Sequence, residues 1–127
     1  MSKLASNMRE SVSRRNPSDL RPIDLVHLAK QTQGDLALEV EILTLFDQTT
    51  RGLADKLKCC ENEQELVLCL HSLKGAAAGV GANGIAQVAR LAEVQFRENG
   101  SVDAEMMADI EFAVVEASAY IAELLKV

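Results

Sequence analysis

The chain has 127 residues, of which 48% are hydrophobic, and this size and composition suit one globular domain with a single core. Aromatic residues make up only 3%, so the core must be aliphatic, and the net charge of −6 disfavours nucleic acid as the main partner. We expect no membrane span, because no run of about eighteen apolar residues occurs. The N-terminus also lacks the apolar segment of a signal peptide, so we expect a cytoplasmic protein.

The charge is spread unevenly along the chain. Residues 1–21 hold five basic and two acidic side chains, a net charge of +3, which leaves −9 for the remaining 106 residues. We expect residues 1–20 to form a flexible leader and residues 21–127 to form the folded domain. The basic leader could contact an anionic surface, although a mobile tail is the simpler interpretation.

The pattern after the leader begins with a short helix and a long one. Pro22 suits the first turn of a helix, which should run to about Thr32 and stop at Gly34. Asp35 is a good N-cap for a second, long helix that ends before Glu61-Asn62-Glu63. Apolar residues at three- and four-residue steps predict its buried face: Leu36, Val40, Leu43, Phe46, Leu53 and Leu57.

Three more helices are expected, over roughly 63–79, over about 84–98 and from a cap at Ser101 or Asp103 onward. The fourth helix should bury Ile85, Val88, Ala89, Ala92 and Phe96, and the last helix Met106, Ile110, Val114, Ala117, Ile121 and Leu124. There is no strand-like alternation. The sequence therefore predicts an all-α protein, an antiparallel up-down-up-down four-helix bundle with a short extra N-terminal helix.

His71 on the third helix is the candidate functional residue. At 100° per residue, one side of this helix collects the residues expected in the core, which are Leu66, Cys69, Leu73, Ala77 and Val80. His71 points nearly opposite. It is surrounded by Gln64, Val67, Leu68, Lys74, Gly75 and Ala78. The histidine should therefore lie on the solvent face.

These neighbours suit a histidine that takes up and gives away an anionic group. Lys74 lies one turn away on the same face, where its ammonium would stabilise an added phosphoryl group. Gly75 has no side chain that would shield the ring. Because a glycine inside a helix lowers stability, its presence here suggests a functional reason, such as the close approach of a partner. Val67, Leu68 and Ala78, with Gln64, give a surface that a partner could cover. The alternative is an ordinary surface histidine beside an ordinary lysine.

His71-x-Leu73-Lys74-Gly75 followed by Gly81-Ala82 resembles the signature of histidine-containing phosphotransfer (HPt) domains. Ile23-Asp24-Leu25, Gly34-Asp35 and Leu43-x-x-Phe46 are also similar to these domains, so the resemblance covers about residues 22–125. The resemblance implies a carrier that accepts a phosphoryl group from the aspartyl phosphate of one receiver domain and passes it to another.

The resemblance also implies roles for single residues. His71 would be the phosphoacceptor, most readily at Nε2, with Lys74 giving electrostatic support and Gly75 access. Gly81 would form the tight turn into the next helix. Glu93 matches the position from which family members often hold the other ring nitrogen, although an ordinary exposed glutamate is the alternative there.

Such a carrier is not an enzyme with its own turnover and needs no cofactor, since Mg²⁺ would come only with the receiver. The expected partners are receiver domains of hybrid histidine kinases and response regulators, and the protein should be a monomer. A helical adaptor that binds such domains without carrying phosphate, or a fragment of a kinase, are the rival functions.

The remaining candidates have weaker support. His27 lacks the Lys-Gly context, so we expect no chemistry from it. The three cysteines are Cys59, Cys60 and Cys69, an odd number without a Cys-x-x-Cys pair, which is typical of free thiols in a reducing compartment. Cys69 and His71 face different sides of a helix and would make poor joint ligands, so we expect no metal site.

Overall fold

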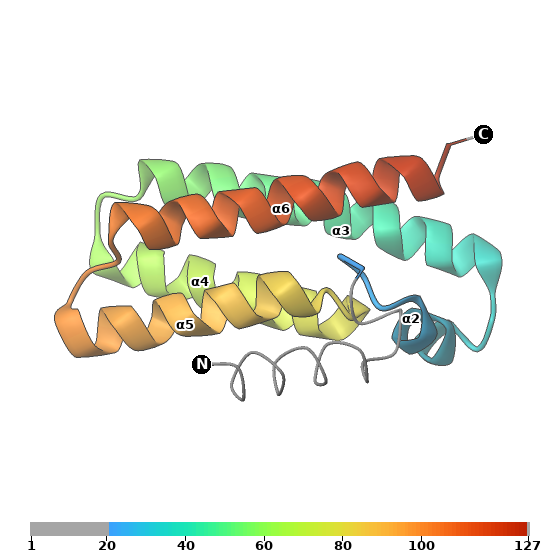
Figure 1. Ribbon diagram of the computed structural model, residues 1–127, viewed down its shortest axis with the longest axis horizontal. Coiled ribbons are helices and arrows are strands. Elements are labelled where there is room, and N and C mark those ends of the chain that lie inside the picture. The colour runs from blue at the N-terminus through green and yellow to red at the C-terminus, as the bar shows by residue number, and fades with distance from the viewer. Residues whose placement is uncertain (1–20, 127) are drawn as a thin grey trace, which may run out of the picture.

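The structure is a computed structural model that describes residues 21–126. Over this range it is helical, with α2 (Leu25–Thr32), α3 (Leu36–Cys59), α4 (Glu63–Val80), α5 (Asn83–Asn99) and α6 (Ala104–Leu124). The four long helices form an antiparallel bundle, and α2 packs at one end of it (Figure 1). The predicted all-α bundle with a short extra helix is confirmed. The predicted leader, residues 1–20, lies outside the described residues.

The short helix α2 starts later than predicted. Its N-cap is Asp24, whose Oδ1 accepts hydrogen bonds from the backbone N–H groups of Val26 and His27 at 3.0 and 3.1 Å. The prediction that Pro22 occupies the first helical turn is therefore wrong, and Pro22 lies in a bend before the cap. An aspartate side chain that satisfies two free N–H groups sets the start of a helix more strongly than the fixed φ of proline.

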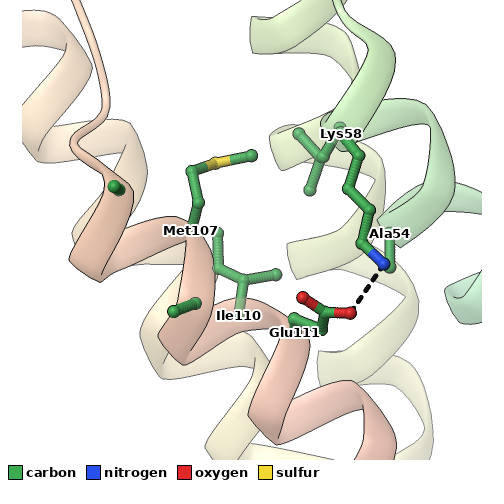
Figure 2. A pocket seen from close by; sticks show the side chains of 8 residues that line it. Ala54, Lys58, Met107, Ile110 and Glu111 are labelled. Atoms are coloured by element: carbon green, nitrogen blue, oxygen red, sulfur yellow. Dashed lines mark ion pairs between the residues drawn. The ribbon is translucent and has the colours of Figure 1, made fainter.

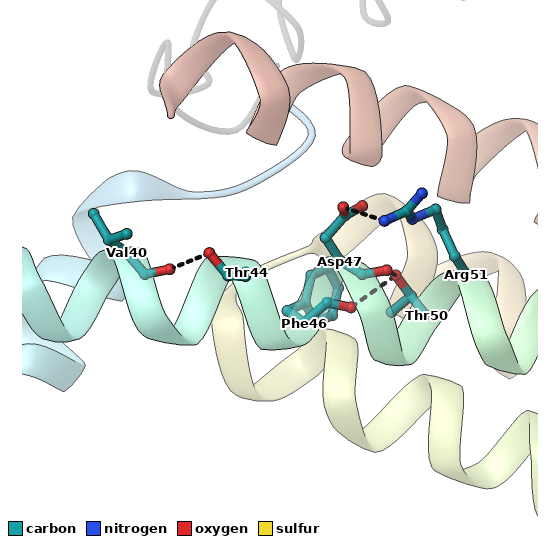
Figure 3. Close-up of polar contacts among 6 residues, drawn as sticks. All are labelled: Val40, Thr44, Phe46, Asp47, Thr50 and Arg51. Atoms are coloured by element: carbon teal, nitrogen blue, oxygen red, sulfur yellow. Dashed lines mark hydrogen bonds and ion pairs between the residues drawn. The ribbon is translucent and has the colours of Figure 1, made fainter. Parts of the chain in front are cut away.

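The long helix α3 begins at the predicted cap, where the Asp35 side chain accepts from the Leu38 N–H at 3.1 Å. Several of its polar side chains find partners within the helix itself (Figure 3). The buried Thr50 hydroxyl donates to the Phe46 carbonyl at 2.9 Å, and Arg51 lies 3.0 Å from the carboxylate one turn earlier. These local bonds leave the inward face of α3 free for apolar packing.

Two residues of the predicted α3 core are exposed. Leu36 is 73% exposed and Val40 is 48% exposed, so their predicted burial is wrong. The ion pair between Lys58 and Glu111 aligns the end of α3 with the first half of antiparallel α6, so the first turns of α3 extend beyond the end of α6. The predicted burial of Leu124 is also wrong, since this residue of the last turn of α6 is 39% exposed.

The turn between α4 and α5 is fixed by α2. Gly81 ends α4 with φ +81°, and its carbonyl accepts a hydrogen bond from the Asp24 N–H at 2.9 Å. A Cβ atom at Gly81 would lie 3.1 Å from both the Asp24 carbonyl oxygen and His27 Cδ2. The His27 ring Nε2 lies 3.3 Å from the Gly79 carbonyl, to which it can donate. This contact gives His27 a structural role, tying α2 to the end of α4.

Candidate functional site

The packing of α4 turns His71 outward. The residues beside it in the helix, Leu70 and Leu73, are both fully buried, while the His71 side chain is 71% exposed. Leu73 and Ala77 were predicted to be buried, whereas Leu70 was not. Because α4 packs against both α3 and α5, its buried arc is wider than the single face seen in the sequence.

A carboxylate from the next helix stands beside the exposed ring. Glu93 of α5 is only 18% exposed, and its Oε2 lies 3.7 Å from His71 Nδ1. This distance is longer than a hydrogen bond, so a small movement of either side chain would close it. Since the two ring nitrogens lie on different edges of the imidazole, Nε2 is the nitrogen turned away from this carboxylate.

The same carboxylate holds the neighbouring cation. Lys74 Nζ lies 2.6 Å from Glu93 Oε1, and the lysine side chain is 36% exposed. The sequence suggested a lysine acting directly on the histidine. The structure places Glu93 between them, so that one carboxylate faces both the imidazole and the ammonium. One face of α4 therefore carries an exposed imidazole with a cation held one helical turn away.

The surface of α4 beyond the ring has little relief. Gly75 is exposed, and a Cβ atom there would meet nothing within 4 Å, so no internal contact requires glycine. Gly79 is also exposed, with nothing within 4 Å of an added Cβ, and Ala78, between the two glycines, is exposed as well. A partner can therefore approach His71 from this side down to the helix backbone.

An apolar depression opens on the other side of the ring. Its volume is about 610 Å³, and it is lined by Glu63, Gln64, Val67, Leu68, His71 and Phe96. Val67 is 42% exposed and Leu68 65%, so both present apolar surface to solvent. Ala78 is not part of this lining. Phe96, which the sequence placed in the core, is half-buried and supplies the α5 wall.

Gly81 does not contact His71 but influences the site through the turn that it forms. Its left-handed conformation reverses the chain between α4 and α5, and these two helices pack closely along their length. This turn sets the register in which Glu93 meets His71 and Lys74. The sequence contains the turn signal, but the meeting of the three side chains follows only from the pairing of the helices.

A model of the Hpt domain matches residues 40–126. This match spans α4, α5 and α6 with nearly all of α3, and it contains His71. The chain belongs to the Hpt domain family. No curated protein and no solved structure gives a significant match. Hpt domains are phosphotransfer carriers that interact with receiver domains and histidine kinases, so family membership implies histidine phosphotransfer in two-component signalling.

A further depression of this Hpt domain lies away from His71. The depression between α3 and α6 has a volume of about 400 Å³ and contains the 2.6 Å ion pair between Lys58 and Glu111 (Figure 2). The hydrogen bond that Lys58 donates to the Glu111 carboxylate raises the pKa of Lys58 above its ordinary value. A protonated lysine bound to a carboxylate is a structural contact and does not provide a nucleophile.

The cysteines are free thiols. Cys59 is exposed, Cys60 half-buried and Cys69 buried, and burial together with the nearby Cys69 raises the pKa of Cys60. Within residues 21–126, no group of three or more His, Cys, Asp or Glu side chains is placed to hold a metal ion. Over the same residues, no helix is both long enough and apolar enough to span a bilayer.

Proposed function

We propose that His71 Nε2 accepts a phosphoryl group from the aspartyl phosphate of a receiver domain and passes it to the aspartate of another. The observation that carries this proposal is an exposed imidazole whose Nδ1 faces a largely buried carboxylate at 3.7 Å. A carboxylate in this position favours the tautomer with the proton on Nδ1. The lone pair is then on Nε2, the nitrogen turned away from Glu93.

The transfer needs no group besides those of the two proteins and the receiver's own divalent cation. The Nε2 lone pair attacks phosphorus, the N–P bond forms as the P–O bond to the receiver aspartate breaks, and the aspartate leaves as a carboxylate. Nδ1 keeps its proton, and Glu93 offsets the positive charge that the ring gains. In the onward step, a second receiver's aspartate attacks phosphorus and Nε2 regains its lone pair.

Lys74 contributes through its charge. In the unphosphorylated protein its ammonium is bound to Glu93 at 2.6 Å. A phosphoryl group on His71 brings negative charge to the same helix face, one turn away, so the ammonium can move from the carboxylate to the phosphoryl oxygens. Glu93 is then free to accept the Nδ1–H bond. Gly75 leaves the path to Nε2 open.

The depression beside His71 is the proposed docking surface for the receiver. Val67 and Leu68 expose apolar side chains there, Phe96 forms the α5 wall, and Gln64 also lines it. Covering this apolar area would contribute binding free energy without contact to the histidine ring. Binding and chemistry therefore use neighbouring but separable residues.

Incubation with a phosphorylated receiver domain tests the acceptor. The wild-type protein should take up an acid-labile, base-stable label. His71→Gln should take up none, while His27→Gln, which keeps a side-chain donor for Gly79, should label normally. Equal labelling of wild type and His71→Gln would show that another residue is the acceptor. A panel of receiver domains would identify the partners and the direction of flow.

The role of Glu93 is tested by Glu93→Gln, which keeps a hydrogen-bond acceptor but removes the charge. Transfer should slow about tenfold, because hydrogen bonds to charged groups contribute about 1.5–3 kcal/mol, more than neutral ones. ¹⁵N NMR of the imidazole should show more of the Nε2–H tautomer. Glu98→Gln, on the exposed side of the same helix, is the matched control. An unchanged tautomer ratio in Glu93→Gln would contradict this role.

The exposed apolar pair Val67 and Leu68 also supports a second candidate function, an adaptor that binds receiver or kinase domains without carrying phosphate. Receiver binding that survives His71→Ala, together with no label on the wild type, would favour the adaptor. Label that arrives from ATP through a separate kinase core, and not from a receiver, would indicate a kinase substrate domain instead.

A further inference from the structure

The helix α6 is apolar on two sides. Its inner face is buried in the bundle, through Ile110, Val114, Ala117 and Ile121. On the opposite side, Phe112 is 68% exposed and Val115 59% exposed. Ala108 and Ala119, one turn to either side of them, are exposed as well. We call these four residues the outer stripe. A helix with apolar residues on two opposite sides is normally covered on both, but the exposure of these residues shows that nothing among residues 21–126 covers the outer stripe.

The outer stripe has an acidic edge. Between Ala104 and Leu124 the helix holds five carboxylates and no lysine or arginine. At 100° per residue, four of them lie along one edge of the stripe, namely Glu105, Asp109, Glu116 and Glu123. Glu111 lies on the other side, where it pairs with Lys58 (Figure 2). The stripe therefore offers apolar area beside a row of negative charge.

This charge pattern disfavours a second copy of the chain as the occupant. In an antiparallel two-fold pairing of α6 with α6, the same edge of each helix meets its own copy, so the acidic edges would face each other. Each chain also carries a net charge of −6. Like charges at such an interface reduce association, whereas a basic segment would be attracted.

The N-terminal segment has the complementary chemistry. Residues 1–20 carry four basic side chains, Lys3, Arg9, Arg14 and Arg15, against two acidic ones. Their apolar side chains include Leu4, Met8 and Val12, which recur at four-residue steps. Among the long helices, α3 and α5 present arginine or lysine at their surfaces, as in Arg51 and Arg97, so α6 is the helix best matched to a basic segment.

The N-terminal segment joins the bundle at a place from which it can reach the outer stripe. Ile23 is fully buried and Asp24 is bonded to the α4–α5 turn, which fixes the start of the described chain at that end of the bundle. Because the bundle is antiparallel, α6 ends there too (Figure 1). The helix α6 is about 30 Å long at 1.5 Å per residue. Twenty residues reach up to about 66 Å when extended, so they can cover the whole outer stripe.

We propose that the outer stripe of α6 binds the basic N-terminal segment, residues 1–20, of the same chain. The apolar side chains of the segment cover Phe112 and Val115, and its arginines face the acidic edge. The tether raises the effective concentration of the segment to about the millimolar range, so weak contacts suffice. The proposal does not depend on the phosphotransfer chemistry, because α6 supplies no residue to the His71 site.

A photo-crosslinker in the full-length chain tests the contact. With p-benzoylphenylalanine in place of Met8, illumination should give intramolecular crosslinks that map to α6. Crosslinks confined to other helices, or no crosslinks from a photoactive probe, would overturn the proposal. Covalent dimers would also overturn it and would indicate a second copy as the occupant. A yield that falls in high salt is expected, since exposed charge contacts are screened.

Two substitutions separate this contact from general effects on the fold. Phe112→Ser should lower the crosslink yield about tenfold, because it removes the largest apolar side chain of the stripe. Leu45→Ser on α3 changes a side chain of similar exposure, 64% against 68%, and should leave the yield unchanged. Both variants should fold, and circular dichroism checks this. An unchanged yield in Phe112→Ser would show that the segment does not bind the stripe.

Charge reversal gives an independent readout. Replacing Asp109 and Glu116 by lysine should lower the yield, and replacing Arg9 and Arg14 by glutamate in the same chain should restore it. Restoration is not expected from a variant that merely damages α6. Failure of this rescue, with all variants folded, would contradict the proposed charge pairing.

Discussion

Replacing Gly75 by alanine should raise stability and lower phosphotransfer at the same time. The site lies inside α4, where glycine is less favourable than alanine by about 1 kcal/mol. A Cβ atom at this position meets nothing within 4 Å, so no clash offsets the gain. For a domain of this size, about 1 kcal/mol raises the Tm by about 4 °C.

The loss of transfer has a separate cause. The new methyl group would project from the turn after His71, into the space through which a receiver aspartate must reach Nε2. A contact that is too tight in a packed interface costs about 1–3 kcal/mol, so the transfer rate should fall about tenfold or more. Receiver binding that depends on Val67 and Leu68 should change less than the rate.

The assay pairs thermal unfolding, followed by circular dichroism, with the rate of label uptake from a phosphorylated receiver. Gly52→Ala is the matched control, since Gly52 lies inside α3 and its added Cβ also meets nothing within 4 Å. The control should gain the same stability and keep the full transfer rate. If Gly75→Ala were more stable and transferred as fast as wild type, the argument that glycine keeps the ring accessible would be refuted.

Three further predictions concern stability and thiol reactivity. Gly81→Ala should lower the free energy of unfolding by about 2–4 kcal/mol, since φ is +81° and the added Cβ would lie 3.1 Å from its nearest neighbours. Gly100→Ala, at φ +76° with no atom within 4 Å of the added Cβ, should lower it by only about 1–2 kcal/mol, and equal losses in denaturant titrations would contradict this account. Asp103→Ala, which removes the cap of α6, should cost about 1 kcal/mol and Asp103→Asn less, and no difference between the two variants would argue against the cap. At pH 8, iodoacetamide should alkylate exposed Cys59 before Cys60, because the raised pKa of Cys60 leaves less thiolate at that pH, and mass spectrometry showing the reverse order would contradict the assignment.

Much of the fold could be predicted from local sequence. The caps Asp35 and Asp103 and the apolar steps define the long helices to within a residue or two, because these signals act over one or two turns. The prediction of buried residues failed where burial depends on the position of a helical turn in the bundle. Leu36 and Val40 have the spacing of core residues, but they lie on turns of α3 that extend beyond α6.

For the candidate site too, some features could be predicted from the sequence and others could not. The outward direction of His71 follows from the periodicity of α4, and the open surface at Gly75 follows from the residue itself. The role of Phe96 could not be read from the helical pattern, because a residue at the edge of a core has the same spacing as one at its centre. The outer stripe of α6 could not be predicted for a related reason, since the sequence does not show which of the apolar residues of a helix its neighbours leave exposed.

The sequence by itself determined the helices and the exposure of His71, because each depends on neighbours within a few residues. Only the tertiary structure decided that Glu93 lies between the imidazole and Lys74, at 3.7 Å from His71 Nδ1 and 2.6 Å from Lys74 Nζ. The physical reason is that an ion pair between helices depends on their register and rotation. The packing of α4 against α5 sets both, and the periodicity of either helix alone does not.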